Sequence, residues 1–138
     1  MIVDATDLLL GRMASFVAKK ALLGEKIDIV NCEKAVISGD RLYLIARYKE
    51  RQLKGNTFKG PFYLRKPNMF VRRTVRGMLP YKKERGKKAY KHIKCYIDIP
   101  EHLKDKKTET IEKANIKKLP NLKYVEVGRI CRLIGAKW

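Results

Sequence analysis

The first 31 residues contain a strand–helix–strand pattern, which limits the possible folds more than any other feature of the sequence. The apolar run MIVDA (1–5) is followed by helical periodicity over residues 8–24 and then by the β-branched run KIDIVN (26–31). Such a unit places two parallel strands in one sheet, joined by a right-handed crossover. We therefore expect an α/β fold with a mainly parallel sheet.

The segment at residues 8–24 has the spacing of an amphipathic helix. Its apolar face consists of Leu9, Met13, Phe16, Val17 and Ala21. Thr6 or Asp7 is expected to cap the start of this helix, and Gly24 stands where a C-terminal cap is typical.

The rest of the chain continues the α/β pattern without an internal repeat, so we expect a single domain spanning residues 1–138. The pattern predicts a short strand at 35–39, helices at 40–55, 68–79 and 82–92, a strand at 93–99, and a final strand and helix within 122–138. Loops are expected at 56–67 and 100–111. The inward positions expected in the second and third helices are Leu42, Leu44, Ile45, Tyr48, Val71, Val75, Met78 and Leu79.

Positive charge is concentrated in the middle of the chain. The net charge is +19, of which residues 1–40 contribute −1, residues 41–98 contribute +15 and residues 99–138 contribute +5. A surface this basic calls for an acidic partner, which is nucleic acid, an anionic membrane or an acidic protein. The uneven distribution predicts a docking face.

Motifs for catalysis, nucleotide binding and metal binding are missing. Gly11 stands alone in the first unit and Lys88 follows the pair at 86–87, so neither G-x-G-x-x-G nor Walker A is present. His92 and His102 have no nucleophile or metal-ligand spacing around them. We expect no enzyme activity, no cofactor and no metal; a nucleotide-handling enzyme would need a phosphate loop or an acid/base pair.

The cysteines and the N-terminus indicate a cytoplasmic protein. Cys32, Cys95 and Cys131 are far apart and form no C-x-x-C pair, which favours buried free thiols in a reducing compartment. No apolar run approaches the ~20 residues that cross a bilayer. Asp4 and Asp7 stand where a signal peptide carries positive charge.

The predicted helix at 68–79 carries Arg72, Arg73 and Arg76, which are related by spacings of one, three and four residues. The planar guanidinium group binds phosphate oxygens bidentately and costs less to desolvate than an ammonium group. A merely solvated face normally intersperses acids, and this helix has none. The helix is therefore expected to bind phosphates while its apolar stripe is buried.

The basic run continues from this helix, so that residues 72–96 hold ten Lys or Arg residues and one acid, Glu84. Gly77 is expected to let another backbone approach closely, and Pro80 to break the helix and redirect the chain. Gly86 would allow contact between backbone and phosphate, although each of these residues also fits an ordinary turn.

The predicted loop at 56–67 interleaves aromatic and basic side chains. They are Phe58, Phe62 and Tyr63, with Lys59, Arg65 and Lys66 between and after them. Such interleaving suits bases stacked on rings with phosphates held beside them. Packing of at least two of the three rings onto the domain explains the pattern equally well.

RNA is the nucleic acid that this sequence favours. Zinc-finger spacing, a heptad-linked basic region and a helix-turn-helix are missing, as are the RNP aromatic signature and a KH-type loop. Charge spread over several elements is expected of a protein that reads the shape and phosphates of folded RNA. A membrane partner is not expected, because the apolar residues are needed for the core.

Three stretches closely resemble the ribosomal protein L13 family, in its archaeal and eukaryotic form. They are VDATDLLLGRMAS (3–15), VNCEKAVISG (30–39) and RTVRGMLPYKKERGKKAYKHIKCYIDIP (73–100). The resemblance extends over nearly the whole chain and is weakest at 104–123. The end at Trp138, without the longer extension of eukaryotic members, favours the archaeal form.

The resemblance implies a three-layer α/β/α domain around a four-stranded parallel sheet. It also implies a structural role in the large ribosomal subunit: binding of 23S-type rRNA beside neighbouring ribosomal proteins, in subunit assembly and translation, without catalysis, cofactor or small-molecule substrate. An RNA-binding regulator that acts off the ribosome is the alternative. The positions that match the family's motifs are Arg12, Arg73, Arg76, Gly77, Pro80, Lys82, Lys83, Arg85, Gly86 and Lys88.

Charge, geometry and resemblance together assign RNA binding chiefly to the basic segment at residues 42–92. The expected RNA-binding residues are Arg12, Lys59, Arg65, Lys66, Arg72, Arg73, Arg76, Gly77, Pro80, Lys82, Lys83, Arg85, Gly86, Lys87, Lys88 and Lys91.

Overall fold

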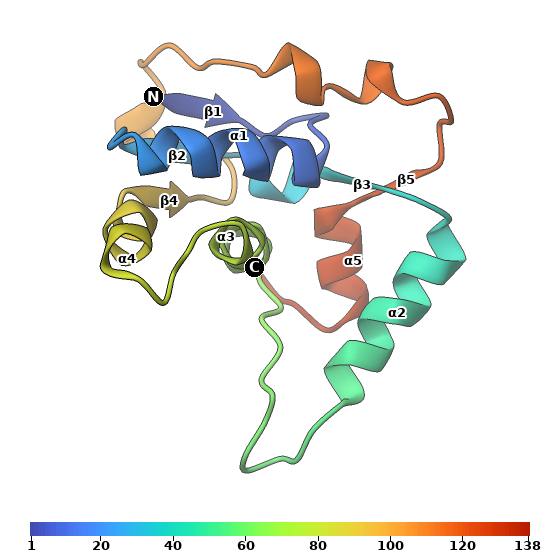
Figure 1. Ribbon diagram of the computed structural model, residues 1–138. Helices are drawn as coiled ribbons and strands as arrows, with labels where there is room; N and C mark the ends of the chain where they lie inside the picture. Colours follow the sequence, from blue (N-terminus) through green and yellow to red (C-terminus); the bar gives the residue numbers. More distant parts are fainter.

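The strand–helix–strand opening is present in the computed structural model, which describes residues 1–138. It consists of β1 (Ile2–Asp4), α1 (Leu10–Leu22) and β2 (Ile27–Val30), and β1 pairs parallel with β2. A third strand, β4 (Ile93–Cys95), lies on the other side of β2, also parallel, so the strand order is β1-β2-β4 (Figure 1). The prediction of an α/β fold with a parallel sheet is confirmed.

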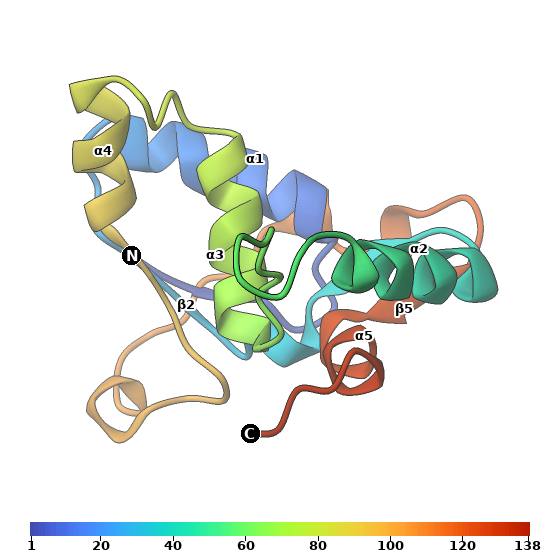
Figure 2. The ribbon, with the colours of Figure 1, turned by 90° about the horizontal axis from the view of Figure 1, so that it is seen from below.

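The register of these strands directs their apolar side chains to the helices. Val3 pairs with Ile29, and Ile27 pairs with Ile93; all four are buried in one core cluster with residues of α1 and of α3 (Pro67–Gly77). The opposite face carries Ile2 and Val30, which pack against Leu103 of a 3-10 turn at Glu101–Leu103. Figure 2 shows α1, α3 and α4 (Glu84–Lys91) on one side of the strands and this turn on the other.

The expected four-stranded parallel sheet is wrong in its fourth strand. The predicted strand at 35–39 forms as β3 (Val36–Ser38), but it pairs antiparallel with β5 (Tyr124–Glu126) in a separate two-stranded sheet. A parallel neighbour needs a crossover of about a dozen residues. The short link from β2 to β3 holds only a 3-10 turn at Cys32–Lys34, so β3 leaves the main sheet.

The remaining predicted helices form with shorter bounds. They are α2 (Arg41–Leu53), α3, α4 and α5 (Val127–Leu133). The strand predicted at 93–99 ends at Cys95, and short 3-10 turns occur at Glu101–Leu103, Glu112–Ala114 and Ile116–Lys118. Pro67 is the first residue of α3, a position where its fixed φ and missing N–H are tolerated.

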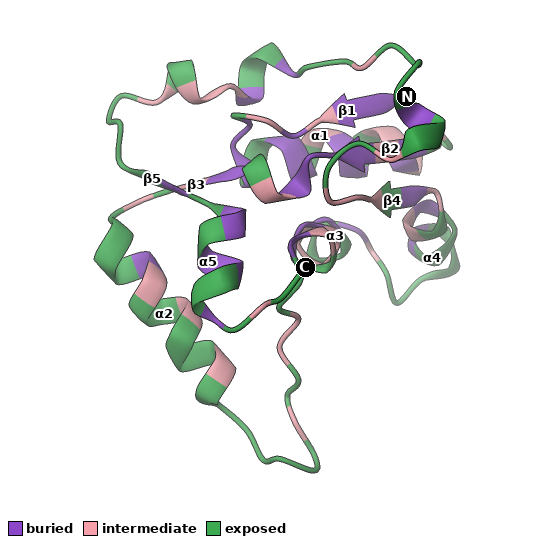
Figure 3. Cartoon of the chain, turned by 180° about the vertical axis from the view of Figure 1, so that it is seen from behind, coloured by how far each residue is buried: buried purple, intermediate pink, exposed green.

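Two expected core positions face solvent. Leu42 is 78% exposed and Met78 is 41% exposed, whereas Leu44, Val71, Val75 and Leu79 are buried as predicted. Leu42 and Leu44 are two residues apart, so one helix cannot turn both inward. Met78 and Leu79 both lie beyond the end of α3, where helical periodicity no longer decides which side chain is buried. Figure 3 shows that much of α2 and of the loop after it is exposed.

The predicted N-terminal caps of α1 are also wrong. Its N-cap residue is Leu9, without a side-chain cap. The Thr6 hydroxyl instead donates to the Asp4 carboxylate at 2.7 Å, which also accepts a hydrogen bond from the buried Asn31 amide at 3.0 Å. This local network competes for the capping side chain. Gly24 follows the helix in a left-handed conformation (φ 96°), as predicted for a C-terminal cap.

No helix of the structure combines the length and the apolar character that a bilayer span requires. All three cysteines are free thiols: Cys32 and Cys131 are buried, and Cys95 is half-buried. Burial raises the pKa of Cys131 to about 12, so this thiol stays protonated and unreactive near neutral pH.

Candidate nucleic-acid interface

Helix α3 carries the arginines on its solvent side. Phe70, Val71 and Val75 are buried against the core, whereas Arg76 is exposed and Arg72 and Arg73 are half-buried. The spacing of apolar residues fixes the rotation of the helix, and the arginines follow from that rotation. No carboxylate lies within ion-pair distance of any of the three arginines.

Each arginine of α3 lies over the ring of a different tyrosine. The distances from guanidinium carbon to ring centroid are 4.6 Å for Arg72 and Tyr90, 5.2 Å for Arg73 and Tyr63, and 5.2 Å for Arg76 and Tyr81. The tyrosines belong to α4, to the loop before α3 and to the turn after α3, respectively. A stacked guanidinium is held in place while the N–H groups at its edge stay able to bind phosphate.

Partial burial of Arg72 leaves one of its N–H donors without a hydrogen-bond partner. Its Nε atom is buried and has no hydrogen-bond partner in the chain. A buried donor without a partner is costly. Arg72 is thus held mainly by the ring of Tyr90, which joins α3 to α4 across the turn between them.

The turn from α3 to α4 is tightly packed, and this explains its glycine. Gly86 is buried in α4, where a Cβ atom would collide with the Pro80 carbonyl and would lie 2.8 Å from the Tyr81 nitrogen. The Pro80 carbonyl also accepts the Lys83 N–H at 2.9 Å. Close packing within the chain therefore accounts for Gly86, and its burial argues against the expected contact between its backbone and a phosphate.

Gly77 differs from Gly86. It is the last residue of α3, it is exposed, and a Cβ atom there would have no neighbour within 4 Å. The direction in which a Cβ atom would project from Gly77 is therefore open to a partner outside the chain.

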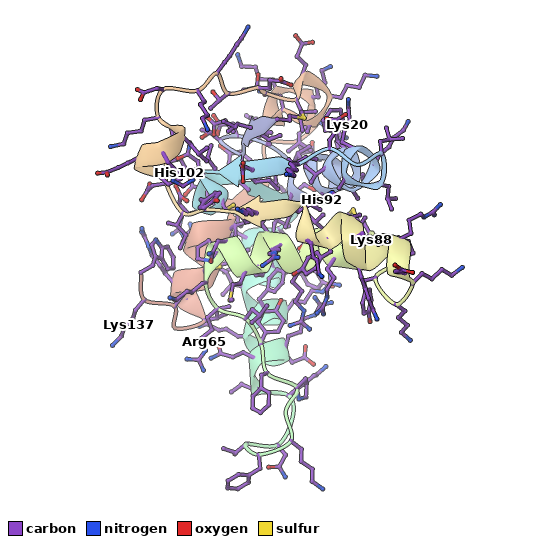
Figure 4. The ribbon with its side chains drawn as sticks, turned by 90° about the vertical axis from the view of Figure 1, so that its left-hand side faces the viewer. Lys20, Arg65, Lys88, His92, His102 and Lys137 are labelled. Carbon is purple, nitrogen blue, oxygen red and sulfur yellow. The ribbon has the colours of Figure 1, made fainter.

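Helix α4 presents its positive charges to solvent. The exposed basic residues of the turn and helix are Lys82, Lys83, Arg85, Lys87, Lys88 and Lys91, while Gly86 and Ala89 are buried. Figure 4 shows Lys88 on this helix and His92 at its end, next to β4. We refer to the exposed side of residues 72–91, formed by α3, the turn and α4, as the basic face.

The cations of the basic face are almost unneutralised. The chain forms only three ion pairs, namely Lys20–Glu25, Lys54–Glu50 and Lys88–Glu84. Lys88 is therefore the only expected RNA-binding cation with a carboxylate partner. Its pair is exposed at 72% and 80% of the two side chains, and such pairs contribute little to stability.

The aromatic residues of the loop at residues 54–66 fall into two groups: one ring packs onto the domain, and two rings are exposed to solvent. Tyr63 is half-buried and packs against Phe70 and Tyr48, with centroid distances of 6.4 Å to each ring. Phe58 and Phe62 are 89% and 71% exposed. One ring thus belongs to the domain, and two are free to meet a partner.

Some expected residues lie away from the basic face. Arg12 lines a groove between α1 and the segment at 109–114. Lys59 is exposed at the tip of the loop, where Asn56 and Gly60 form a bridge. Arg65 and Lys66 are exposed just before α3; Arg65 reaches Gly135 near the C-terminus, and Figure 4 shows it well apart from Lys88.

Sequence reasoning missed Tyr81, Tyr90 and Arg51 as parts of the interface. Tyr81 and Tyr90 bracket the second basic run, and their position at its two ends was the available signal. Arg51 lies 5.7 Å from the ring of Tyr48, three residues earlier on α2. That i,i+3 spacing was visible in the sequence, but the ring could equally have been covered by the core.

Comparison with known proteins supports the resemblance seen in the sequence. The model of the family described as "Ribosomal protein L13" matches residues 1–102. The chain is 45% identical over 138 residues to "Large ribosomal subunit protein uL13" of Methanosarcina barkeri, which covers 99% of both chains.

Two further relatives carry the same name. The protein of Archaeoglobus fulgidus is 42% identical over 135 residues, covering 97% of this chain and 86% of the relative. That of Haloarcula marismortui is 40% identical over 136 residues, covering 99% of this chain and 91% of the relative. The family match and these identities over nearly full length show that the chain belongs to the ribosomal protein L13 family.

Proposed function

We propose that this chain is a structural constituent of the large ribosomal subunit that binds large-subunit rRNA through its basic face. The observation that carries the proposal is a continuous face of Arg and Lys with one ion-paired member, Lys88, on a protein of a ribosomal family. The relatives are named as proteins of the large subunit. An rRNA backbone supplies the negative charge that the face lacks.

The chemistry of the face suits phosphates better than base edges. Arg72, Arg73 and Arg76 are held by rings, so they lose little side-chain freedom when they bind. The lysines of α4 are mobile point charges that add affinity without sequence preference. Binding of this kind recognises the shape of a folded RNA and fixes the protein's position on it.

The N-terminal part has a different role in this proposal. Residues 1–40 carry a net charge of −1 and supply β1, α1 and β2 of the core. This part keeps the basic face rigid and leaves a nearly neutral surface for neighbouring ribosomal proteins. The chain thereby supports subunit assembly and translation as a scaffold.

The test is sedimentation of the tagged protein from a cell lysate through a sucrose gradient after a high-salt wash. Stoichiometric recovery in the large-subunit peak is expected. Recovery at the top of the gradient, with RNA or alone, would contradict the ribosomal assignment and favour the regulator that acts off the ribosome.

Replacement of Arg76 by alanine is expected to weaken rRNA binding by about 1–3 kcal/mol, the scale of a charge-assisted hydrogen bond with its desolvation. Arg76 is exposed and its guanidinium group lies over the Tyr81 ring at the surface, so the fold should persist. Filter binding measures the affinity and circular dichroism checks the fold.

Arg132→Ala is the matched control for this variant. Arg132 is also exposed and also lies over an aromatic ring, that of Trp138 at 5.2 Å, but it belongs to α5. It should leave rRNA affinity nearly unchanged. If Arg76→Ala unfolds the protein without a separate binding defect, Arg76 serves the structure and its assignment fails.

A further inference from the structure

A pocket of about 380 Å³ lies beside the basic face, between α2, α3 and the loop that joins them. Its aromatic wall consists of Tyr48 from α2, Tyr63 from the loop and Phe70 from α3. The rings pack on one another in tilted and edge-on geometry, with centroid distances of 5.3 to 6.4 Å. Three consecutive segments, α2, the loop and α3, thus form one wall.

The rest of the lining is basic. Arg51, Lys54 and Arg73 line the pocket, and no carboxylate does. The guanidinium group of Arg51 lies 5.7 Å from the Tyr48 ring, and that of Arg73 lies 5.2 Å from the Tyr63 ring. Lys54 is paired at 2.7 Å with Glu50, an exposed residue outside the lining.

The two tyrosine hydroxyls stay neutral. Burial is the main cause that raises the pKa of Tyr48 and of Tyr63, and it outweighs the lowering by nearby arginines. The pocket therefore keeps its positive charge at physiological pH and offers neutral hydroxyls beside two guanidinium planes.

We propose that this pocket holds a single unpaired nucleotide of the bound RNA, with its base stacked on the guanidinium plane of Arg51 and its phosphate near Lys54. This inference rests on the proposed rRNA binding and adds to it a site that reads an individual base. Proteins recognise RNA sequence mainly at loops and bulges, where bases are free to stack on aromatic rings or on arginine.

Size and surroundings agree with a nucleotide. The volume is near the lower end of the range of about 300–1,000 Å³ for pockets that enclose small ligands, so a paired helix cannot enter. The exposed rings of Phe58 and Phe62 lie on the adjoining loop. They extend the stacking surface for the nucleotides on either side of the one in the pocket.

The experiment probes deproteinised large-subunit rRNA with reagents that modify the Watson–Crick edges of unpaired bases, with and without the full-length chain. Three proteins are compared: wild type, Arg51→Lys and Lys49→Ala. Arg51→Lys keeps the charge but removes the planar group. Lys49→Ala removes an exposed charge of the same helix that lies outside the pocket.

Wild type and Lys49→Ala are expected to protect the same one or two unpaired bases, and Arg51→Lys is expected to leave them reactive. The affinity of Arg51→Lys should fall roughly five- to tenfold, within the range for loss of one base stack. The salt dependence of its binding should not change, because its charge is intact.

Other results overturn the inference in distinguishable ways. If Arg51→Lys protects the same bases as wild type, the pocket holds no base, and rRNA binding through the basic face still stands. If wild type binds no rRNA, the proposed function fails and the pocket inference fails with it.

Discussion

Raising the salt concentration from about 50 to about 200 mM is expected to weaken rRNA binding by this chain about 10³- to 10⁵-fold. Each phosphate that a Lys or Arg neutralises releases condensed counterions, and salt opposes that release. If roughly eight phosphates are neutralised, log K falls against log salt with a slope of about −6 to −7. The basic face supplies at least that many cations, all but Lys88 without an internal partner.

Fluorescence anisotropy of labelled rRNA over a series of salt concentrations gives the slope. The triple variant with Lys82, Lys87 and Lys91 replaced by alanine should make the slope smaller by roughly 2–3. A matched triple variant at Lys104, Lys106 and Lys107, which are exposed but outside the basic face, should keep the wild-type slope. A wild-type slope near zero would refute an electrostatic interface.

Replacement of Gly86 by alanine is expected to destabilise the protein by about 1–3 kcal/mol, the usual cost of overpacking. The direction is informative, because alanine in place of glycine inside a helix normally adds about 0.5–1 kcal/mol of stability. Here the new methyl group would collide with the Pro80 carbonyl and with the Tyr81 backbone, and neither is a flexible side-chain end.

Gly11→Ala is the matched control for this variant. Gly11 is also helical, in α1, and a Cβ atom there would have no neighbour within 4 Å. That variant should be as stable as wild type or slightly more stable. Urea unfolding followed by circular dichroism measures both free energies of unfolding. Equal stability of Gly86→Ala and wild type would show that α4 and the Pro80 turn are not held together as described.

Displacement of α4 by the Gly86→Ala methyl group should also reach the basic face. Tyr81 and Tyr90, which carry the guanidinium groups of Arg76 and Arg72, lie on either side of Gly86. The variant should therefore lose rRNA affinity at temperatures where it is still folded, whereas Gly11→Ala should not.

The sequence by itself determined the elements whose causes are local. A short apolar run and a β-branched run predicted β1 and β2, and the helical periodicity between them predicted α1. The parallel pairing of the two strands follows from the crossover that joins them. The solvent-facing arginines of α3 were equally predictable, because Phe70, Val71 and Val75 fix the rotation of that helix. The concentration of positive charge in the middle of the sequence indicated an acidic partner, in agreement with the rRNA that we propose.

The errors arose where local signals compete. Thr6 has a side chain suited to a cap, but its hydroxyl donates to the Asp4 carboxylate. That carboxylate also accepts a hydrogen bond from Asn31, which directly follows β2. Gly86 was expected either to admit a phosphate or to fit an ordinary turn, because glycine permits close contact without specifying which atom makes it. Only the folded chain shows that this atom is the Pro80 carbonyl.

Tertiary structure alone decided which residues distant in the sequence meet. The pairing of β3 with β5 joins residues 36–38 to residues 124–126, and no pattern within either segment specifies that partner. The tyrosines that hold the α3 arginines come from three different segments, and so do the rings of the nucleotide-sized pocket. Periodicity indicates which side chains of a segment face the core and which face solvent. Which other segment it contacts depends on the packing of the whole chain, because burial of apolar surface is decided over the entire fold.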